Sequence, residues 1–226
     1  MLDLTGFISI IFVIILTIIL AYRFQSISKR LYTALIVRVL LMLLGNYVIT
    51  LPDSTSDALA FEARAWVMSQ DTLSNIIKIY KPTGSGFYVW FISILYNLFG
   101  RSVLMIESMS LLFGMGSVFI GWKIAKILYN EKIAIKVAWS IALFPALILY
   151  SVLILREVYI YFFLLLAIYG VVSWTKNNSI KFFFYAILGF GIATLFHGAM
   201  AIGGIVFLFT LIFKNFFFTT LLERKF

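Results

Sequence analysis

The residues that could do chemistry gather in one polar stretch, residues 51–86, of an otherwise apolar chain. The stretch holds four of the nine carboxylates and three cations, which are Asp53, Asp57, Glu62, Asp71, Arg64, Lys78 and Lys81. Cations beside carboxylates at a membrane surface indicate a site for an anion, of which phosphate is the commonest at a bilayer. Long loops are usually functional, so this stretch predicts a site rather than a simple connection.

Three further residues are candidates for the same site. The charged pair Arg156–Glu157 follows an apolar run, and the only histidine, His197, stands between two short ones. The pair is equally consistent with the tip of a helical hairpin, and His197 with a hydrogen-bonding turn residue. Together with Asp53 and Asp57, Glu157 and His197 are candidate ligands for a divalent metal ion. No His-x-x-Glu or His-x-His spacing supports such a site, so metal dependence stays open.

Within the polar stretch, a short helix is expected over residues 58–68. Ser54, Thr55 or Ser56 can cap its start, and Asp57 then stabilises its first turn. The other two carboxylates of the stretch, Glu62 and Asp71, are expected to be solvated or paired with cations.

The composition is that of a membrane protein. The 226 residues are 63% hydrophobic and 12% charged, with a mean hydropathy of +1.08. The net charge of +9 is spread between apolar runs, so it indicates topology and argues against nucleic-acid binding. The absence of cysteine excludes disulfides, thiolate metal sites and a cysteine nucleophile. The N-terminus lacks the basic region of a signal peptide, so the first apolar run is expected to be retained.

Eight apolar runs follow one another closely, at residues 5–22, 31–51, 87–99, 103–122, 133–155, 158–174, 182–196 and 199–213. They predict an all-α, polytopic membrane protein that forms a single integral membrane domain over residues 1–226. Run 87–99 rises only about 20 Å as a helix, less than the roughly 30 Å of a bilayer core. We therefore expect about seven transmembrane helices and one re-entrant or interfacial helix.

The basic residues between the runs predict the orientation. Lysines and arginines cluster at residues 23–30, 123–136, 176–181 and 214–225, and these segments are expected to be cytoplasmic. All four basic segments can lie on the cytoplasmic side only if run 87–99 does not cross the membrane. Arg101, Arg156, Glu157 and His197 then face outward with the polar stretch; if run 87–99 does cross, Glu157 and His197 lie on the opposite side.

Four short motifs, in order, resemble those of the GT-C glycosyltransferases. The first is an acid followed at four-residue steps by an aromatic and a small residue, here Asp57, Phe61 and Ala65, with Pro52–Asp53 as an alternative match. A Lys81–Pro82 pair then opens an aromatic segment that ends at Phe99–Gly100, and Leu155-Arg156-Glu157 resembles the segment with the family's second acid. The fourth motif, Phe196-His197-Gly198-Ala199, is similar to a place that often reads Thr-Lys-Gly. The closest likeness is to the branch with lipid A aminoarabinose transferases and protein O-mannosyltransferases, over residues 30–213.

The resemblance implies transfer of a sugar from a polyprenyl-phosphate donor to an acceptor on the outer face of a membrane. Asp57 or Asp53 would be the base of an inverting reaction, assisted by Glu157, while Lys81, Arg101 and Arg156 would bind the lipid phosphate. His197 would contact substrate or metal. The resemblance also implies a bacterial inner membrane location with a periplasmic site, no certain cofactor, and coverage of the family's N-terminal half after an extra span at 5–22.

Two other interpretations remain open. The chain could be a non-catalytic or truncated relative that acts as a membrane subunit, with a partner membrane protein that supplies further helices. It could also be a component of an envelope polysaccharide polymerase or flippase. A polymerase would carry its charges in larger outer loops late in the chain, and a transporter would show internal repeats; the sequence shows neither.

Overall fold

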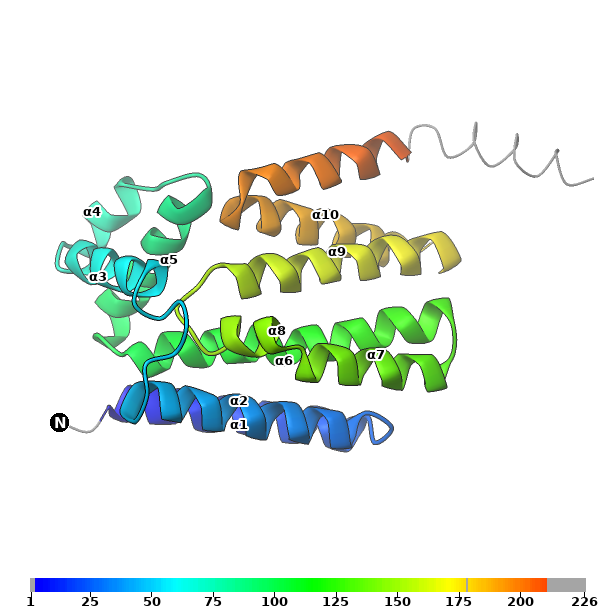
Figure 1. Cartoon of the computed structure of the whole chain (residues 1–226). Coiled ribbons are helices and arrows are strands. Elements are labelled where there is room, and N and C mark those ends of the chain that lie inside the picture. The colour runs from blue at the N-terminus through cyan, green and yellow to red at the C-terminus, as the bar shows by residue number, and fades with distance from the viewer. Residues whose placement is uncertain (1–2, 178, 211–226) are drawn as a thin grey trace, which may run out of the picture.

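The computed structural model describes residues 3–177 and 179–210 of the chain. Every regular element among them is helical, and the long helices run side by side in a bundle (Figure 1). The elements are α1 (Leu4–Arg23), α2 (Ser28–Tyr47), α3 (Asp57–Ser69), α4 (Leu73–Lys78), α5 (Gly84–Phe99), α6 (Val103–Leu128), α7 (Glu131–Leu143), α8 (Pro145–Tyr150), α9 (Glu157–Asn177), α10 (Ile180–Phe196) and the 3₁₀ turn η1 (Gly198–Met200). Beyond His197 a further apolar helix extends over Gly198–Thr210. The end of run 199–213 and the basic segment 214–225 fall outside the described residues.

Three helices are long and apolar enough to cross a membrane, namely α1, α6 and α9. Helix α6 is the central one, since two thirds of its most apolar window is buried, against about a quarter for α1 and α9. Several shorter apolar helices accompany them, including α5, α10 and Gly198–Thr210. The described part of the chain is therefore all-helical and compatible with a helical membrane protein, while the count of about seven membrane helices stays a prediction.

Helix α5 does not run the length of the bundle. Its first residue, Gly84, lies against Arg156 at the start of α9, because a Cβ built there would be 3.4 Å from the guanidinium. Just beyond its other end, the Ser102 hydroxyl donates to Asp3, the N-cap of α1, at 2.7 Å. Helices α1 and α9 both start at the end of the bundle where α3, α4 and α5 gather (Figure 1). Both ends of α5 thus lie at one end of the bundle, while the expectation that residues 87–99 form a re-entrant or interfacial helix stays a prediction.

The expectation of one continuous span over residues 133–155 is wrong. Helix α7 stops at Leu143, α8 starts at Pro145 as a single short element, and residues 151–156 are not helical. Proline has no N–H to donate and disfavours helical backbone in the residue before it, here Phe144 with ψ 118°. The break therefore follows from Pro145, although the run stays apolar across it.

A buried arginine from α2 satisfies the carbonyls that this break leaves free. Arg38 is fully buried, and its guanidinium donates to the carbonyls of Ala142 at 2.7 Å and Ile141 at 3.3 Å. Its Nε also donates to the Ser151 hydroxyl at 2.9 Å. Because lipid offers no hydrogen-bond partners, a helix break within the bundle needs donors of this kind.

Small residues bring α9 and α10 together. A Cβ on Gly170 would come within 2.3 Å of the Ala186 backbone nitrogen, and one on Gly189 within 2.5 Å of that of Ala167. These small residues lie three apart along each helix, on facing turns, and small residues at a contact let membrane helices approach closely. Helix α10 runs back toward the end of the bundle where α3, α4 and α5 lie, and the chain reverses direction there at His197 (Figure 1).

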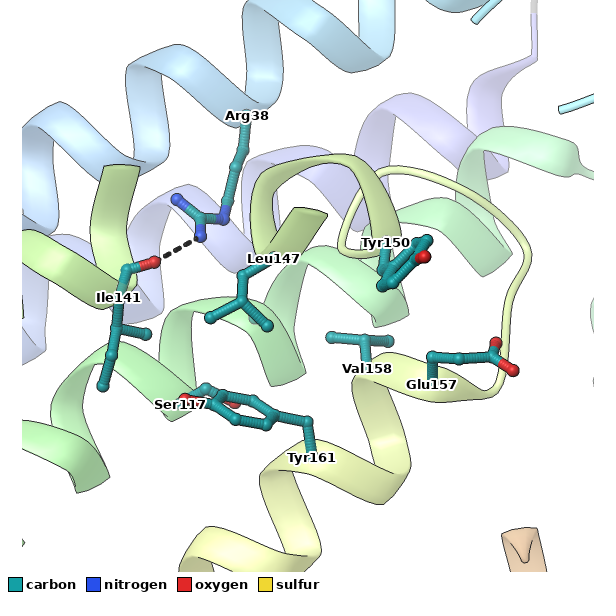
Figure 2. Close-up of a pocket in the computed structure, with 9 residues that line it drawn as sticks. Arg38, Ser117, Ile141, Leu147, Tyr150, Glu157, Val158 and Tyr161 are labelled. Atoms are coloured by element: carbon teal, nitrogen blue, oxygen red, sulfur yellow. Dashed lines mark hydrogen bonds between the residues drawn. The ribbon is translucent and has the colours of Figure 1, made fainter. Parts of the chain in front are cut away.

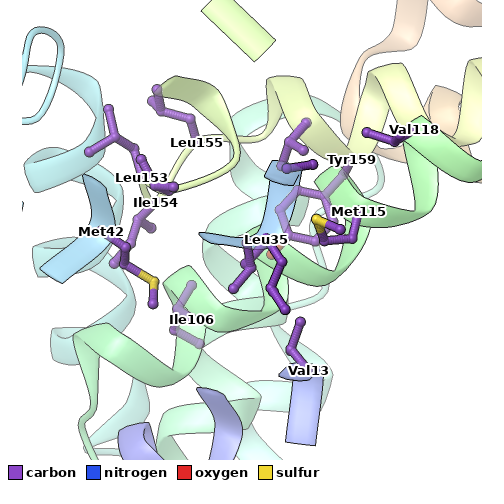
Figure 3. Packing of buried hydrophobic residues seen from close by; sticks show 14 of the residues in the cluster. Val13, Leu35, Met42, Ile106, Met115, Val118, Leu153, Ile154, Leu155 and Tyr159 are labelled. Carbon is purple, nitrogen blue, oxygen red and sulfur yellow. The ribbon is translucent and has the colours of Figure 1, made fainter. Parts of the chain in front are cut away.

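The buried core is built around α6 (Figure 3). Ile106, Met115 and Val118 of α6 pack with Leu35 of α2 and Tyr159 of α9. Segment 151–156 joins this core, because its four aliphatic side chains, Val152, Leu153, Ile154 and Leu155, are all buried. A non-helical segment is thereby fixed in place directly before the first residue of α9.

Candidate active site

Asp53 and Asp57 are positioned by a tight turn between α2 and α3. The buried Leu51 side chain packs against Gly45 of α2, and the Ser54 hydroxyl and N–H both donate to the Leu51 carbonyl. Asp53 lies within this turn at φ +63°, a conformation that aspartate tolerates better than most residues. Helix α3 begins at Asp57, as the sequence predicts, although the side chain of its N-cap Ser56 makes no capping bond.

Glu157 is positioned by the first turn of α9. The buried segment 151–156 precedes it, and the N–H groups of Tyr159 and Ile160 close the turn on the Arg156 carbonyl. One carboxylate oxygen, Oε1, lies 3.7 Å from Arg156 Nε, while Oε2 has no hydrogen-bond partner. A carboxylate is favoured there because the helix N-terminus carries partial positive charge.

These three carboxylates line one pocket of about 220 Å³. Its walls are Asp53, Ser56, Asp57, Tyr150, Leu155 and Glu157. The pocket thus joins the α2–α3 turn to the α8–α9 connection, segments that are about a hundred residues apart in the chain. Ser56 and Tyr150 were not singled out from the sequence; Ser56 was considered only as a cap, and Tyr150 carries no signal beyond its place after the Pro145 break.

A smaller cavity of about 20 Å³ lies deeper in the bundle and shares Tyr150 and Glu157 with this pocket. Arg38 lines its far side (Figure 2). In this view Arg38 reaches toward the Ile141 carbonyl, and the Glu157 carboxylate points away from it. Arg38 thus lines the deeper cavity and holds the end of α7, and among the described residues it forms no ion pair with Glu157.

Arg156 connects the acidic pocket to the two other predicted motifs. Its NH1 donates to the Phe196 carbonyl at 3.4 Å and lies beside Gly84, whose φ of +73° favours glycine. The exposed Lys81 packs its aliphatic part over Gly86 in the first turn of α5. The start of α5, the start of α9 and the end of α10 therefore meet at Arg156.

His197 is exposed at the end of α10, next to this junction. Its Nδ1 accepts a hydrogen bond from the Ala199 N–H at 3.4 Å and so caps η1. Among residues 3–177 and 179–210, no three His, Cys, Asp or Glu side chains are grouped to hold a metal ion. The described geometry thus places His197 in a turn, and it does not assemble the metal ligands that the sequence suggested.

Arg101 lies away from the acidic pocket, on the other side of α3. Its Nε and NH2 each donate to the Glu62 carboxylate at 2.9 Å, and its guanidinium covers the Trp66 ring at 5.2 Å. The Tyr96 hydroxyl also donates to Glu62, at 3.2 Å. Arg101 and Glu62 also line a pocket of about 220 Å³ that is separate from the acidic one. Because Glu62 is on α3 and Arg101 directly follows α5, their ion pair ties the two helices together.

Asp71, the last carboxylate of residues 51–86, is an exposed turn residue. The Asn75 side chain and the Thr72 N–H donate to its carboxylate at 2.8 Å and 2.7 Å. These two hydrogen bonds lower the pKa of Asp71 below its ordinary value. Asp71 is thus hydrogen-bonded within its own turn and does not face the acidic pocket.

A protein-family model matches more than half of the chain. Residues 85–225, more than half of the chain, match the model of a family described as dolichyl-phosphate-mannose-protein mannosyltransferase. The matched part contains Arg156, Glu157 and His197, while Asp53 and Asp57 precede it. No curated protein and no solved structure matches the chain. The resemblance to GT-C enzymes is confirmed at the level of the family, and the chain belongs to the dolichyl-phosphate-mannose-protein mannosyltransferase family.

Proposed function

We propose that the protein transfers a sugar from a polyprenyl-phosphate-linked donor to an acceptor hydroxyl at the acidic pocket. The observation that carries the proposal is the meeting of Asp53, Asp57 and Glu157 around one pocket, with Arg156 beside Glu157. The family supplies the reaction class, since its name describes transfer of mannose from a lipid phosphate.

In the proposed reaction the acceptor oxygen attacks the anomeric carbon as the bond from that carbon to the phosphate oxygen breaks. The acceptor proton passes to Asp57 or Asp53, both exposed at the pocket, and the anomeric configuration inverts. Glu157 orients the acceptor or assists the base from the opposite wall.

The departing lipid phosphate gains negative charge as the bond breaks, so it needs cations at the membrane surface. Arg156 and Lys81 are the cations at the junction of α5, α9 and α10, and we assign the phosphate to them. Arg101 is given a structural role, because two of its guanidinium nitrogens already bind Glu62.

The distribution of basic residues supports an outward-facing site in one integral membrane domain. The α1–α2, α6–α7 and α9–α10 connections lie at the end of the bundle opposite α3–α5 (Figure 1). These connections and the adjoining helix ends carry Arg23, Lys29, Arg30, Lys123, Lys126, Lys132, Lys136, Lys176 and Lys181. Basic residues favour the cytoplasmic side, which would place the acidic pocket at the outer, periplasmic face of a bacterial inner membrane.

The catalytic proposal is tested by replacing the two aspartates singly and together. In membranes supplied with polyprenyl-phosphate mannose, the variant that removes the base should lose about 10²-fold or more of its transfer rate, as expected for general base catalysis. Asp71→Asn is the matched control, because Asp71 is an exposed carboxylate outside the pocket. Full activity in both Asp53→Asn and Asp57→Asn would refute the assignment, and an inactive wild-type chain would favour the non-catalytic interpretation.

The orientation is tested by cysteine labelling, since the chain has no cysteine of its own. Ser56→Cys and His197→Cys lie at the pocket end and Lys136→Cys at the opposite end, and all three positions are exposed. An impermeant maleimide added to intact cells should label the first two and should reach Lys136→Cys only after permeabilisation. The reverse pattern would place the pocket on the cytoplasmic side.

A further inference from the structure

A basic pocket, lined in part by two lysines, lies at the end of the bundle opposite the acidic pocket. It has a volume of about 300 Å³ and is lined by Phe24, Trp122, Lys123, Lys126, Ile127 and Tyr169. These residues come from the ends of α1 and α6 and from α9. The proposed transfer reaction makes no use of this pocket.

The ammonium group of Lys123 lies among three aromatic rings in this pocket. Its Nζ lies 4.9 Å from the centre of the Phe119 ring, 5.5 Å from that of Tyr169 and 5.6 Å from that of Phe24. Among the described residues no carboxylate forms an ion pair with it, whereas the neighbouring Lys126 is paired with Glu131 at 2.7 Å. The half-buried charge of Lys123 is thus without an anionic partner.

Further lysines surround the pocket. Lys181 of α10 lies beside the pocket wall, since its Nζ covers the Tyr185 ring at 5.7 Å. Tyr185 stacks on Tyr169 of the pocket wall, with ring centres 6.3 Å apart. Lys176 donates to the carbonyl of Ile127, also in the wall, at 3.2 Å. The described residues thus place four lysines and one carboxylate, Glu131, around this pocket, so an anion bound beside Lys123 and Lys181 would meet uncompensated positive charge.

We propose that this pocket binds the phosphate of an anionic phospholipid headgroup, with Lys123 as the main contact and Lys181 as the second. The aromatic walls favour a ligand with apolar parts beside its phosphate, which a lipid has and free phosphate lacks. Basic pockets between membrane helices, at the end of a bundle where headgroups lie, are suited to such ligands. The apolar residues Ile15, Ile18 and Ile19 of α1, exposed toward the same end, offer a surface along which acyl chains can lie.

The test measures lipid binding to the purified full chain, delipidated in detergent, by native mass spectrometry. Phosphatidylglycerol should bind the wild-type chain more tightly than phosphatidylcholine does. Lys123→Gln and Lys181→Gln should each weaken phosphatidylglycerol binding about fivefold, as expected for one basic contact to an anionic lipid. Lys136→Gln is the matched control, since it removes an equal charge from an exposed site on α7 at the same end.

Three outcomes would overturn the proposal. Equal binding of the two lipids would show that charge is not recognised, and equal losses in Lys136→Gln and Lys123→Gln would show only a general electrostatic attraction. Displacement of phosphatidylglycerol by inorganic phosphate in the same concentration range would make free phosphate the ligand instead of a lipid. Lys181 is exposed, so Lys181→Gln keeps the test valid if Lys123→Gln lowers the stability of the bundle.

Discussion

The ion pair between Arg101 and Glu62 offers a direct test of how α3 is held on the bundle. The Glu62 side chain, on α3, is 5% exposed, and that of Arg101, just after α5, is 48% exposed. Arg101→Met keeps much of the aliphatic length but removes both guanidinium donors. Glu62 is then left as a buried carboxylate with one neutral donor, the Tyr96 hydroxyl.

The cost of this change lies between two known limits. Removing one partner of a fully buried ion pair costs about 3–5 kcal/mol, and an exposed pair contributes only about 0–1 kcal/mol. Because Arg101 is half exposed, water can reach the carboxylate in the variant, and we expect a loss of about 2 kcal/mol. Glu62→Gln should cost less, about 1 kcal/mol, since its side-chain oxygen still accepts from Arg101 and Tyr96.

Hydrogen exchange in detergent measures this loss where it occurs. A loss of about 2 kcal/mol corresponds to roughly 30-fold faster exchange of the amides that open locally, here those of α3 and the end of α5. Glu62→Gln is the matched variant, and it should change exchange less than Arg101→Met. Unchanged exchange in Arg101→Met, together with a raised KM for the lipid donor, would refute the structural role and assign Arg101 to the donor phosphate.

Two stability predictions follow from close contacts in the bundle. Gly170→Ala places a Cβ against the Ala186 backbone and should destabilise the protein by about 1–3 kcal/mol or more. Gly191→Ala has open space around it and should stabilise the protein by about 0.5–1 kcal/mol. Thermal unfolding in detergent compares the two variants, and equal effects would contradict the packing argument. Arg38→Met leaves two buried carbonyls without donors, at about 1–3 kcal/mol each. Adding Pro145→Ala, which restores one N–H, should recover part of that loss, and no recovery in chemical unfolding would contradict this reading of the helix break.

The parts of the fold that could be predicted from sequence depend on local rules. Run 87–99 is too short to cross a bilayer easily, and the structure places both ends of α5 at one end of the bundle. Helix α3 starts at Asp57, whose carboxylate has a favourable place in the first turn, although the expected serine cap does not form. The break at Pro145 was missed, because hydropathy stays high across residues 133–155 and hides a signal that proline itself carries.

The parts that could not be predicted depend on contacts between distant segments. Glu62 and Arg101 are 39 residues apart, and Arg38 binds the Ser151 hydroxyl across 113 positions. No pattern in the sequence says which of several carboxylates a cation will meet, so the pairing of Arg101 with Glu62 could not be predicted. For the same reason the sequence left open whether His197 would meet the carboxylates or lie in a turn.

The buried Arg38 explains how this bundle can carry a non-helical segment beside its site. Unpaired backbone groups are costly inside a membrane, so segment 151–156 can exist at this depth only where protein groups replace the missing helical bonds. Arg38 binds the free end of α7 and the Ser151 hydroxyl at once, and Gly114 of α6 leaves room for Ser151 to approach. The segment so anchored ends at Glu157, on the wall of the acidic pocket. Arg38→Met should therefore slow transfer as well as lower stability, whereas Gly170→Ala, at the far contact of α9 and α10, should lower stability alone.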